Sequence, residues 1–291
     1  MDKIFLKARA KINLSLDVLR KRSDGYHDVK MIMQTIDLHD SILIKKQQEL
    51  GIKIKCNLSY VPTDNRNIVY KVTEKIINDY DIKEGVYINL RKNIPVSAGL
   101  GGGSTNGAAV LIGLNKLFDL SLSKEELMKI GAEFGADIPY CILGGTALAE
   151  GIGEKLTILP SLPEIIILIC KPHAHISTEY VYKNLDLKKI ISRPDTELLI
   201  SAIKNKDIGK IAKNMVNVLE SVTVEEKPEI RELKNILIKN GALGAMMSGT
   251  GTSMFGIFEN RFQALKTSKQ LRKFSKEIFI TKTFSEKENL K

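Results

Sequence analysis

The chain has 291 residues, which is enough for two domains and a large buried core. Apolar residues make up 43% and charged residues 27%, as in an ordinary soluble globular protein. Three cysteines, far apart and in no C-x-x-C pair, predict reduced thiols in a cytoplasmic protein, with neither a disulfide framework nor structural zinc. No apolar signal core opens the chain, and the longest apolar run, residues 165–170, is too short to cross a membrane.

The formal net charge of +10 indicates either an anionic partner or a lysine-rich, solvated surface. Lysines are spread along the whole chain, and there is no basic arm, zinc-finger spacing or interleaving of aromatic with basic residues. We therefore expect no nucleic-acid partner. A small phosphorylated ligand needs only a local positive site and is the simpler expectation.

The first predicted element is a half-buried strand at 8–18, in which apolar and polar residues alternate. Its polar face, expected to be available for chemistry, carries Lys7, Arg9, Lys11, Asn13, Ser15 and Asp17. A turn around Gly25 follows. The elements predicted next are strands at 29–38, 41–46, 51–58 and 86–91 and a helix at 65–79.

Residues 95–105 read Pro-Val-Ser-Ala-Gly-Leu-Gly-Gly-Gly-Ser-Thr and lead into a helix. Glycines permit positive φ and close backbone approach, and a glycine loop opening a helix directs unpaired N–H groups at one spot. The segment therefore predicts a phosphate-binding loop; the alternative is a flexible turn. It is not a Walker A loop, since no Lys follows the glycines, and Ser104 stands where the dinucleotide motif needs glycine.

The second half of the chain begins after a predicted linker, Pro160-Ser-Leu-Pro163, so the expected domains are 1–159 and 160–291. Before the linker, a Ser-x-x-Glu capping box at Ser123 begins a helix that runs to about residue 134, and residues 135–139 end it and begin another. The elements predicted after it are strands at 165–170, 243–248 and 253–258, helices at 177–185, 195–204, 207–219 and 227–239, and a second glycine cluster at 248–253.

Taken together, these motifs resemble those of the GHMP small-molecule kinases. The family's Pro-x-x-x-Gly-Leu-Gly-[Ser/Gly]-[Ser/Gly]-Ser motif is matched at 95–104, and its third motif is similar to 244–251. Five more segments are similar to the members that act on a cytidine-diphosphate-linked sugar alcohol. They are Ala-Lys-Ile-Asn-Leu at 10–14, Arg-x-Asp-Gly-Tyr-His at 22–27, Gly-Ala-Asp-Ile-Pro at 135–139, Gly-x-Gly-Glu at 151–154 and Ser-Thr-x-x-Val-Tyr at 177–182.

The resemblance implies an α+β protein with a ribosomal-protein-S5-like N-terminal domain that binds ATP and a ferredoxin-like C-terminal domain. It implies transfer of the ATP γ-phosphoryl group to the 2-hydroxyl of cytidine-diphosphate-linked methylerythritol, in the non-mevalonate route to isoprenoids. Mg²⁺ is the implied cofactor, with its protein ligands left open. The nucleotide-binding residues are expected to be Pro95, Val96, Ser97, Ala98, Gly99, Leu100, Gly101, Gly102, Gly103, Ser104 and Thr105.

Two residues are expected to carry the chemistry. Asp137 would be the base that accepts the hydroxyl proton, and Lys11 would stabilise both its carboxylate and the charge on the transferring group. Taken singly, each has an ordinary interpretation, because a lone lysine on a strand is usually solvated and an aspartate before Ile-Pro is usually a helix cap.

The substrate is expected to lie against aromatic side chains. Tyr26, His27 and Tyr182 would recognise the cytidine part by stacking, and Asn13 would contact the sugar alcohol. The alternatives are a structural turn for the first two residues and helix packing for Tyr182. Rival functions are a GHMP kinase for mevalonate or homoserine and a non-catalytic nucleotide- or RNA-binding protein. We expect a monomer or weak homodimer.

Overall fold

A computed structural model describes residues 1–285 of the chain, which forms two compact units. The first unit is built from residues 1–10, 38–96 and 101–143, and the second from residues 11–37, 97–100 and the chain from 144 onward. Two long strands, β1 (Lys3–Lys21) and β2 (His27–Gln47), contribute to both units. The domain limits at 159 and 160 stay a prediction.

The strand β1 is longer than predicted and is buried on both faces from residue 10 to residue 18. Its apolar face is buried as expected, but Lys11, Asn13, Ser15 and Asp17 are also buried, so the expectation of a half-buried strand was wrong here. Their polar groups find partners in distant segments. For example, the Ser15 hydroxyl accepts a hydrogen bond from the backbone N–H of Ile32 at 3.2 Å. Buried polar groups are stable only when they are paired in this way.

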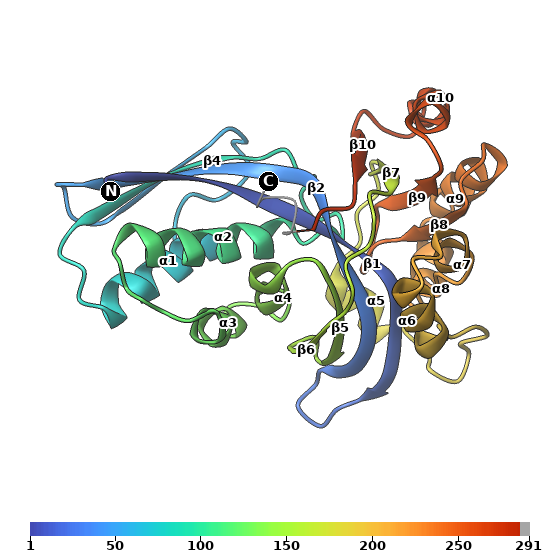
Figure 1. The fold of residues 1–291 in the computed structure, drawn as a ribbon, viewed down its shortest axis with the longest axis horizontal. Coiled ribbons are helices and arrows are strands. Elements are labelled where there is room, and N and C mark those ends of the chain that lie inside the picture. Colours follow the sequence, from blue (N-terminus) through green and yellow to red (C-terminus); the bar gives the residue numbers. More distant parts are fainter. Residues whose placement is uncertain (286–291) are drawn as a thin grey trace. The chain divides into compact units, whose positions relative to one another are not determined.

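The first unit packs helices on a small sheet, and Figure 1 shows α1 and α2 side by side in it. In that sheet β4 (Gly85–Arg91) pairs antiparallel with β2 and parallel with β3 (Ile52–Cys56). The helices are α1 (Ile68–Asp79), α2 (Gly102–Leu117), α3 (Lys124–Ala132) and α4 (Ile138–Leu143). The predicted capping box opens α3, whereas the helix predicted at 65–79 begins later because Asn67 caps it.

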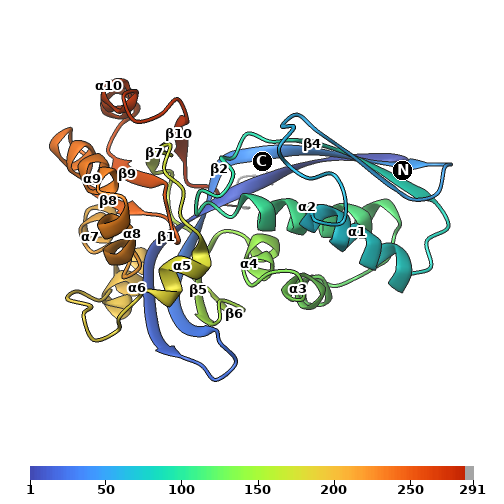
Figure 2. The same ribbon diagram turned by 180° about the vertical axis from the view of Figure 1, so that it is seen from behind.

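The second unit contains a four-stranded antiparallel sheet with the order β10-β7-β9-β8, seen in Figure 2. Its strands are β7 (Ile166–Cys170), β8 (Gly244–Met247), β9 (Met254–Phe258) and β10 (Ile278–Lys282). The helices α9 (Glu229–Lys239) and α10 (Arg261–Leu271) pack against it. This is the strand order of a ferredoxin-like domain, as predicted. Helix α10 and strand β10 were not predicted from the sequence.

The second unit also contains the C-terminal part of β1 and the N-terminal part of β2. Two more strands of the sheet that contains β2 lie in this unit: β5 (Thr146–Gly151) pairs antiparallel with β2, and β6 (Lys155–Ile158), which was not predicted, pairs antiparallel with β5. Four short helices complete the unit: α5 (Thr178–Lys183), α6 (Thr196–Lys204), α7 (Ile208–Lys213) and α8 (Glu220–Glu226).

The helix predicted at 207–219 ends early, at Lys213. Beyond it the backbone pairs with β1 instead of continuing the helix. The N–H of Leu16 donates to the carbonyl of Val216 at 2.9 Å, and the N–H of Val218 donates to the carbonyl of Leu16 at 3.0 Å. Tertiary pairing has overridden the local helical pattern.

Candidate active site

The two glycine clusters predicted from the sequence meet in the second unit. Gly99 adopts a φ of +73°, and a Cβ built there would lie 2.0 Å from the carbonyl oxygen of Ser248. The Ser248 hydroxyl donates to the carbonyl of Gly99 at 2.9 Å. Any side chain at 99 would both strain the backbone and collide with this neighbour. Close packing of two backbone turns therefore requires glycine at this position.

Lys11 and Asn13 join these turns to β1. The Lys11 N–H donates to the carbonyl of Leu100 at 3.0 Å, and its ammonium donates to Asn13 Oδ1 at 3.0 Å. The same Oδ1 accepts the N–H of Gly249 at 3.1 Å. Both residues therefore contact the glycine-rich turns directly, Lys11 through its backbone N–H and Asn13 through its side chain. Asn13 is fully buried, and its contact with a substrate stays a prediction.

A further residue of this region, Asn217, was missed from the sequence. Its side-chain amide donates to the carbonyls of Met247 at 2.9 Å and Gly249 at 2.7 Å, and its Oδ1 accepts the N–H of Leu219 at 3.0 Å. Asn217 thus fixes the backbone at the beginning of the second glycine cluster by hydrogen bonds. Nothing in its local sequence distinguishes it from an ordinary loop asparagine.

In the first unit, α2 begins inside the predicted phosphate loop. Gly101 is its N-cap with a φ of +69°, and the helix follows at Gly102. The Thr105 hydroxyl donates to the carbonyl of Arg9 at 2.6 Å, so it anchors the first turn of α2 to β1. The first amides of a helix have no acceptor within it and lie at the positive end of its dipole. The loop and helix start therefore fit an anionic phosphate group.

Asp137 immediately precedes α4, close to the first turn of α2. A Cβ on Gly135 would lie 4.0 Å from Ser104 Oγ, and a Cβ on Gly107 would lie 3.4 Å from Cδ1 of Ile138. These small residues let α4 approach α2, which brings the turn carrying Asp137 beside the start of the phosphate loop helix. The approach of Lys11 to Asp137 stays a prediction.

Within residues 1–285, no three histidine, cysteine, aspartate or glutamate side chains are grouped so as to hold a metal ion. Glu133, a carboxylate that follows the glycine loop in the chain, pairs on the surface with Lys75 at 3.2 Å. The chain thus fits a magnesium ion only if most ligands come from elsewhere, as happens when Mg²⁺ binds through one or two carboxylates and substrate phosphates.

The predicted aromatic residues lie at the beginning of β2 and in α5. The rings of His27 and Tyr182 have centroids 5.1 Å apart and are tilted by 31°, within the range of favourable aromatic pairs. Tyr26 directly precedes His27 in the chain and is 61% exposed. Burial, aided by Lys21, lowers the pKa of His27, which favours a neutral imidazole. The structure thus brings His27 and Tyr182 together as an aromatic pair.

Two parts of the sequence match the N-terminal and the C-terminal domains of one protein family. Residues 67–145 match the GHMP kinases N terminal domain, and residues 199–277 match the GHMP kinases C terminal family. The chain is 53% identical over 283 residues to 4-diphosphocytidyl-2-C-methyl-D-erythritol kinase of Acetivibrio thermocellus, covering 97% of this chain and 100% of that relative. It is 52% identical over 280 residues to the kinase of the same name from Caldicellulosiruptor saccharolyticus, covering 96% of this chain and 97% of the relative.

Solved structures agree with these matches. The structure of a 4-(cytidine 5'-diphospho)-2C-methyl-D-erythritol kinase superposes with a TM-score of 0.84 at 27% identity, covering 97% of this chain and 100% of that one. A homoserine kinase from Cytophaga hutchinsonii superposes with a TM-score of 0.77 at 20% identity, covering 98% of this chain and 95% of that one. The second likeness shows a shared fold. No helix of residues 1–285 has the length and apolar character that crossing a membrane requires.

Proposed function

The chain belongs to the 4-diphosphocytidyl-2-C-methyl-D-erythritol kinase family of the GHMP kinases, and we propose that it transfers the γ-phosphoryl group of ATP to the 2-hydroxyl of that substrate. The observation that carries the proposal is identity of 52–53% along nearly the whole of both chains, in relatives that bear this name. The reaction would serve the non-mevalonate route to isoprenoid precursors. Rivals acting on mevalonate or homoserine share the fold at much lower identity.

Phosphoryl transfer needs mainly positioning and stabilisation of charge. In the proposed mechanism, residues 95–105 hold the triphosphate through backbone N–H groups at the start of α2. Asp137 accepts the proton of the attacking hydroxyl, which raises the nucleophilicity of its oxygen. Lys11 offsets negative charge on the transferring group and on the Asp137 carboxylate. The buried Lys11 side chain supports this role, because a desolvated ammonium acts through a lower effective dielectric constant.

A magnesium ion bound to the phosphates would neutralise charge on the β- and γ-phosphoryl oxygens. Ser104 Oγ and the Asp137 carboxylate belong to segments that lie side by side at the start of α2. We propose that they are the closest protein groups to such an ion. A small number of protein ligands fits the preference of Mg²⁺ for a partly hydrated shell.

We propose that the cytidine part binds against Tyr26, His27 and Tyr182. The contact between His27 and Tyr182 supports this assignment, because a flat pyrimidine ring stacks well on aromatic faces. A neutral His27 imidazole has one donor and one acceptor nitrogen, which suits the mixed donor and acceptor edge of cytosine. Asn13 would make a polar contact with the sugar-alcohol part of the substrate.

The decisive assay measures phosphorylation of 4-diphosphocytidyl-2-C-methyl-D-erythritol with ATP and magnesium, beside mevalonate and homoserine. We expect turnover of the cytidine substrate alone, and kcat lower by about 10²–10⁴-fold in Asp137→Asn because general-base catalysis is lost. Lys11→Met is expected to lower kcat as well, whereas the surface control Glu133→Gln is expected to behave as wild type. Full activity of Asp137→Asn would refute the mechanism, and preference for mevalonate would refute the substrate.

The setting of the enzyme also belongs to this proposal. We propose a cytoplasmic monomer or weak homodimer that binds ATP and the small cytidine-diphosphate substrate and has no nucleic-acid partner. The three cysteines are all free thiols, which supports a reducing compartment. Sedimentation velocity at several protein concentrations measures the assembly state.

A further inference from the structure

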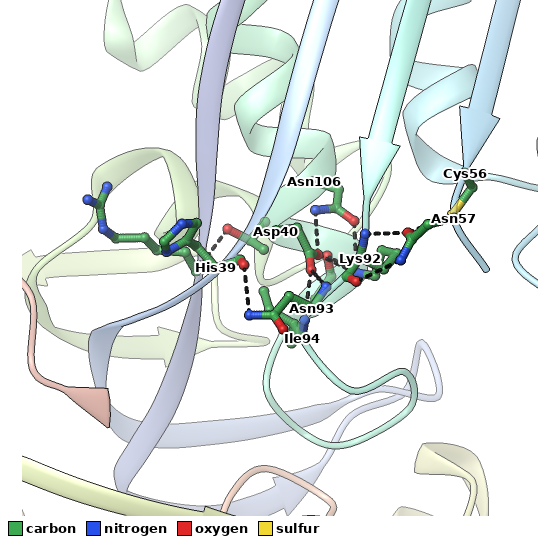
Figure 3. Close-up of polar contacts among 11 residues, drawn as sticks. His39, Asp40, Cys56, Asn57, Lys92, Asn93, Ile94 and Asn106 are labelled. Atoms are coloured by element: carbon green, nitrogen blue, oxygen red, sulfur yellow. Dashed lines mark hydrogen bonds and ion pairs between the residues drawn. The ribbon is translucent and has the colours of Figure 1, made fainter. Parts of the chain in front are cut away.

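A closed cluster of three buried polar side chains lies in the first unit, outside every motif discussed above (Figure 3). Asp40 is fully buried, and the side chain of Lys92 is 5% exposed. The Lys92 ammonium donates to Asp40 Oδ2 and, at 3.0 Å, to Asn106 Oδ1. The Asn106 amide donates in turn to Asp40 Oδ2 at 2.8 Å, which completes the ring.

Stability alone is a weak reason for such a cluster. Removing two charges from water costs several kcal/mol per ion in general, and well-packed apolar residues often serve a core equally well. What a buried ion pair can provide is a defined geometry for the segments that its hydrogen bonds join. The segments joined here indicate its role.

Both ends of the phosphate loop bind to this cluster. On the side where the loop begins, Asp40 Oδ1 accepts the backbone N–H groups of Asn93 at 2.6 Å and Ile94 at 2.8 Å, directly before Pro95. On the side where the loop ends, the Lys92 ammonium lies 3.5 Å from the carbonyl oxygen of Gly102. The cluster therefore fixes the separation between the beginning and the end of the loop.

Packing around Gly102 adds to this restraint. A Cβ at Gly102 would lie 3.1 Å from Cγ2 of Ile94 and 3.2 Å from the Lys92 ammonium, which is tighter than ordinary contact. Asn57 also braces the backbone of Lys92, accepting its N–H at 2.7 Å and donating to its carbonyl at 3.1 Å. The first turn of α2 is thus held closely against the strand end that feeds the loop.

We infer that Asp40, Lys92 and Asn106 form a positioning cluster for nucleotide phosphate, which sets the place and direction of the first amides of α2. The inference rests on the proposed function in one respect, namely that residues 95–105 bind the triphosphate of ATP. Phosphate binding at a helix start depends on donors held within fractions of an ångström. The cluster supplies that precision from a site that need not touch the ligand.

The test compares two asparagines of the same helix. Asn106→Ala keeps the ion pair but removes its side-chain link to α2, so that only the contact between the Lys92 ammonium and the Gly102 carbonyl still joins the two. The control Asn115→Ala removes two hydrogen bonds to Leu122, of 2.9 and 3.0 Å, near the other end of the helix. We expect calorimetry to show a Kd for ATP about 10- to 100-fold higher in Asn106→Ala and unchanged in Asn115→Ala. The KM for the cytidine substrate is expected to stay within about twofold in both.

A second variant separates positioning from folding. Asp40→Asn combined with Lys92→Met removes both buried charges but keeps an acceptor oxygen for the N–H groups of Asn93 and Ile94, and it is expected to unfold within a few degrees of wild type. Its Kd for ATP is nevertheless expected to rise, by at least as much as in Asn106→Ala. The partly exposed pair Lys46 and Glu84, 3.1 Å apart, provides the control when both are neutralised.

Two results would overturn the positioning role, and a third would refute only the proposed function. Equal ATP affinity in wild type and Asn106→Ala would overturn the positioning role. A parallel loss of ATP affinity, cytidine-substrate affinity and thermal stability in the variants would show a merely structural role and would overturn it too. A wild-type protein that binds ATP through this loop but does not phosphorylate the cytidine substrate would refute the proposed function and leave the positioning role standing.

Discussion

Replacing Gly99 with alanine tests whether the contact between the two glycine-rich turns is essential. Gly99 has a φ of +73°, and its added Cβ would lie 2.0 Å from the Ser248 carbonyl oxygen. Gly145 offers a matched control in the same unit, since it has a φ of +73° with nothing within 4 Å of a built Cβ. Both substitutions therefore strain the backbone equally, but only Gly99→Ala brings its Cβ into collision with the Ser248 carbonyl.

The expected losses in the free energy of unfolding come from two contributions, the backbone strain and the steric collision. A left-handed backbone costs a non-glycine residue about 1–2 kcal/mol, and this cost applies to both variants. Forcing a methyl group against a packed backbone adds about 1–3 kcal/mol, and only Gly99→Ala carries this cost. We expect a free energy of unfolding lower by about 1–2 kcal/mol in Gly145→Ala and by about 2–5 kcal/mol in Gly99→Ala. For a chain of this size each kcal/mol corresponds to about 2–4 °C in Tm.

The assay combines thermal unfolding with ATP titration. Relief of the collision requires the loop or the Ser248 turn to move by about 1 Å, and a misplacement of that size costs about 10²-fold in function. Gly99→Ala is thus expected to lose both stability and ATP affinity, whereas Gly145→Ala loses only a little stability. Equal Tm and equal ATP affinity in the two variants would refute the reasoning, because the contact with Ser248 would then carry no cost.

Two further predictions concern titrating groups. Burial raises the pKa of Cys170 to about 12, so alkylation of the native protein at pH 8 is expected to modify Cys56 and Cys141 only, and mass spectrometry would count a third adduct only after unfolding. Burial lowers the pKa of His27 below its ordinary value near 6.5, so the unfolded chain binds more protons between the two values and stability is lost as pH falls below about 6.5. His27→Asn is expected to lose less Tm than wild type between pH 7.5 and 5.5, and identical pH profiles would contradict this assignment.

The family resemblance was found from local motifs, and the α+β fold and the ferredoxin-like half that it implied are confirmed. Glycines that need positive φ, a capping box at Ser123 and alternating strand residues act over a few positions. The phosphate loop is of this kind, since loop and helix start are contiguous in the chain. Lys11 and Asn13 were singled out only through the family resemblance, and in the structure both contact the glycine-rich turns, Lys11 through its backbone N–H and Asn13 through its side chain.

The polar groups that brace the loop could not be predicted in this way. Lys92 lies in an Arg-Lys-Asn run that is typical of a solvated surface, and its partner Asp40 stands 52 residues earlier in the chain. Asn217 is a similar case, since it holds carbonyls 30 and 32 residues further on. Whether such a residue is buried depends on which distant segments cover it, and a single sequence carries no signal for that.

The positions of the loop require glycine for different physical reasons, and this difference affects how the loop binds a phosphate. Gly99 faces the Ser248 carbonyl and Gly102 faces Ile94 and Lys92, so both are required by contacts within the protein. Gly103 has only one neighbour near its built Cβ, Cδ1 of Ile68 at 3.7 Å, and is the position least constrained by packing. A loop shaped mostly by its own protein contacts holds its N–H donors in place before a phosphate arrives. Donors fixed in advance need no reorganisation during the reaction, which is the condition under which they stabilise a transition state most.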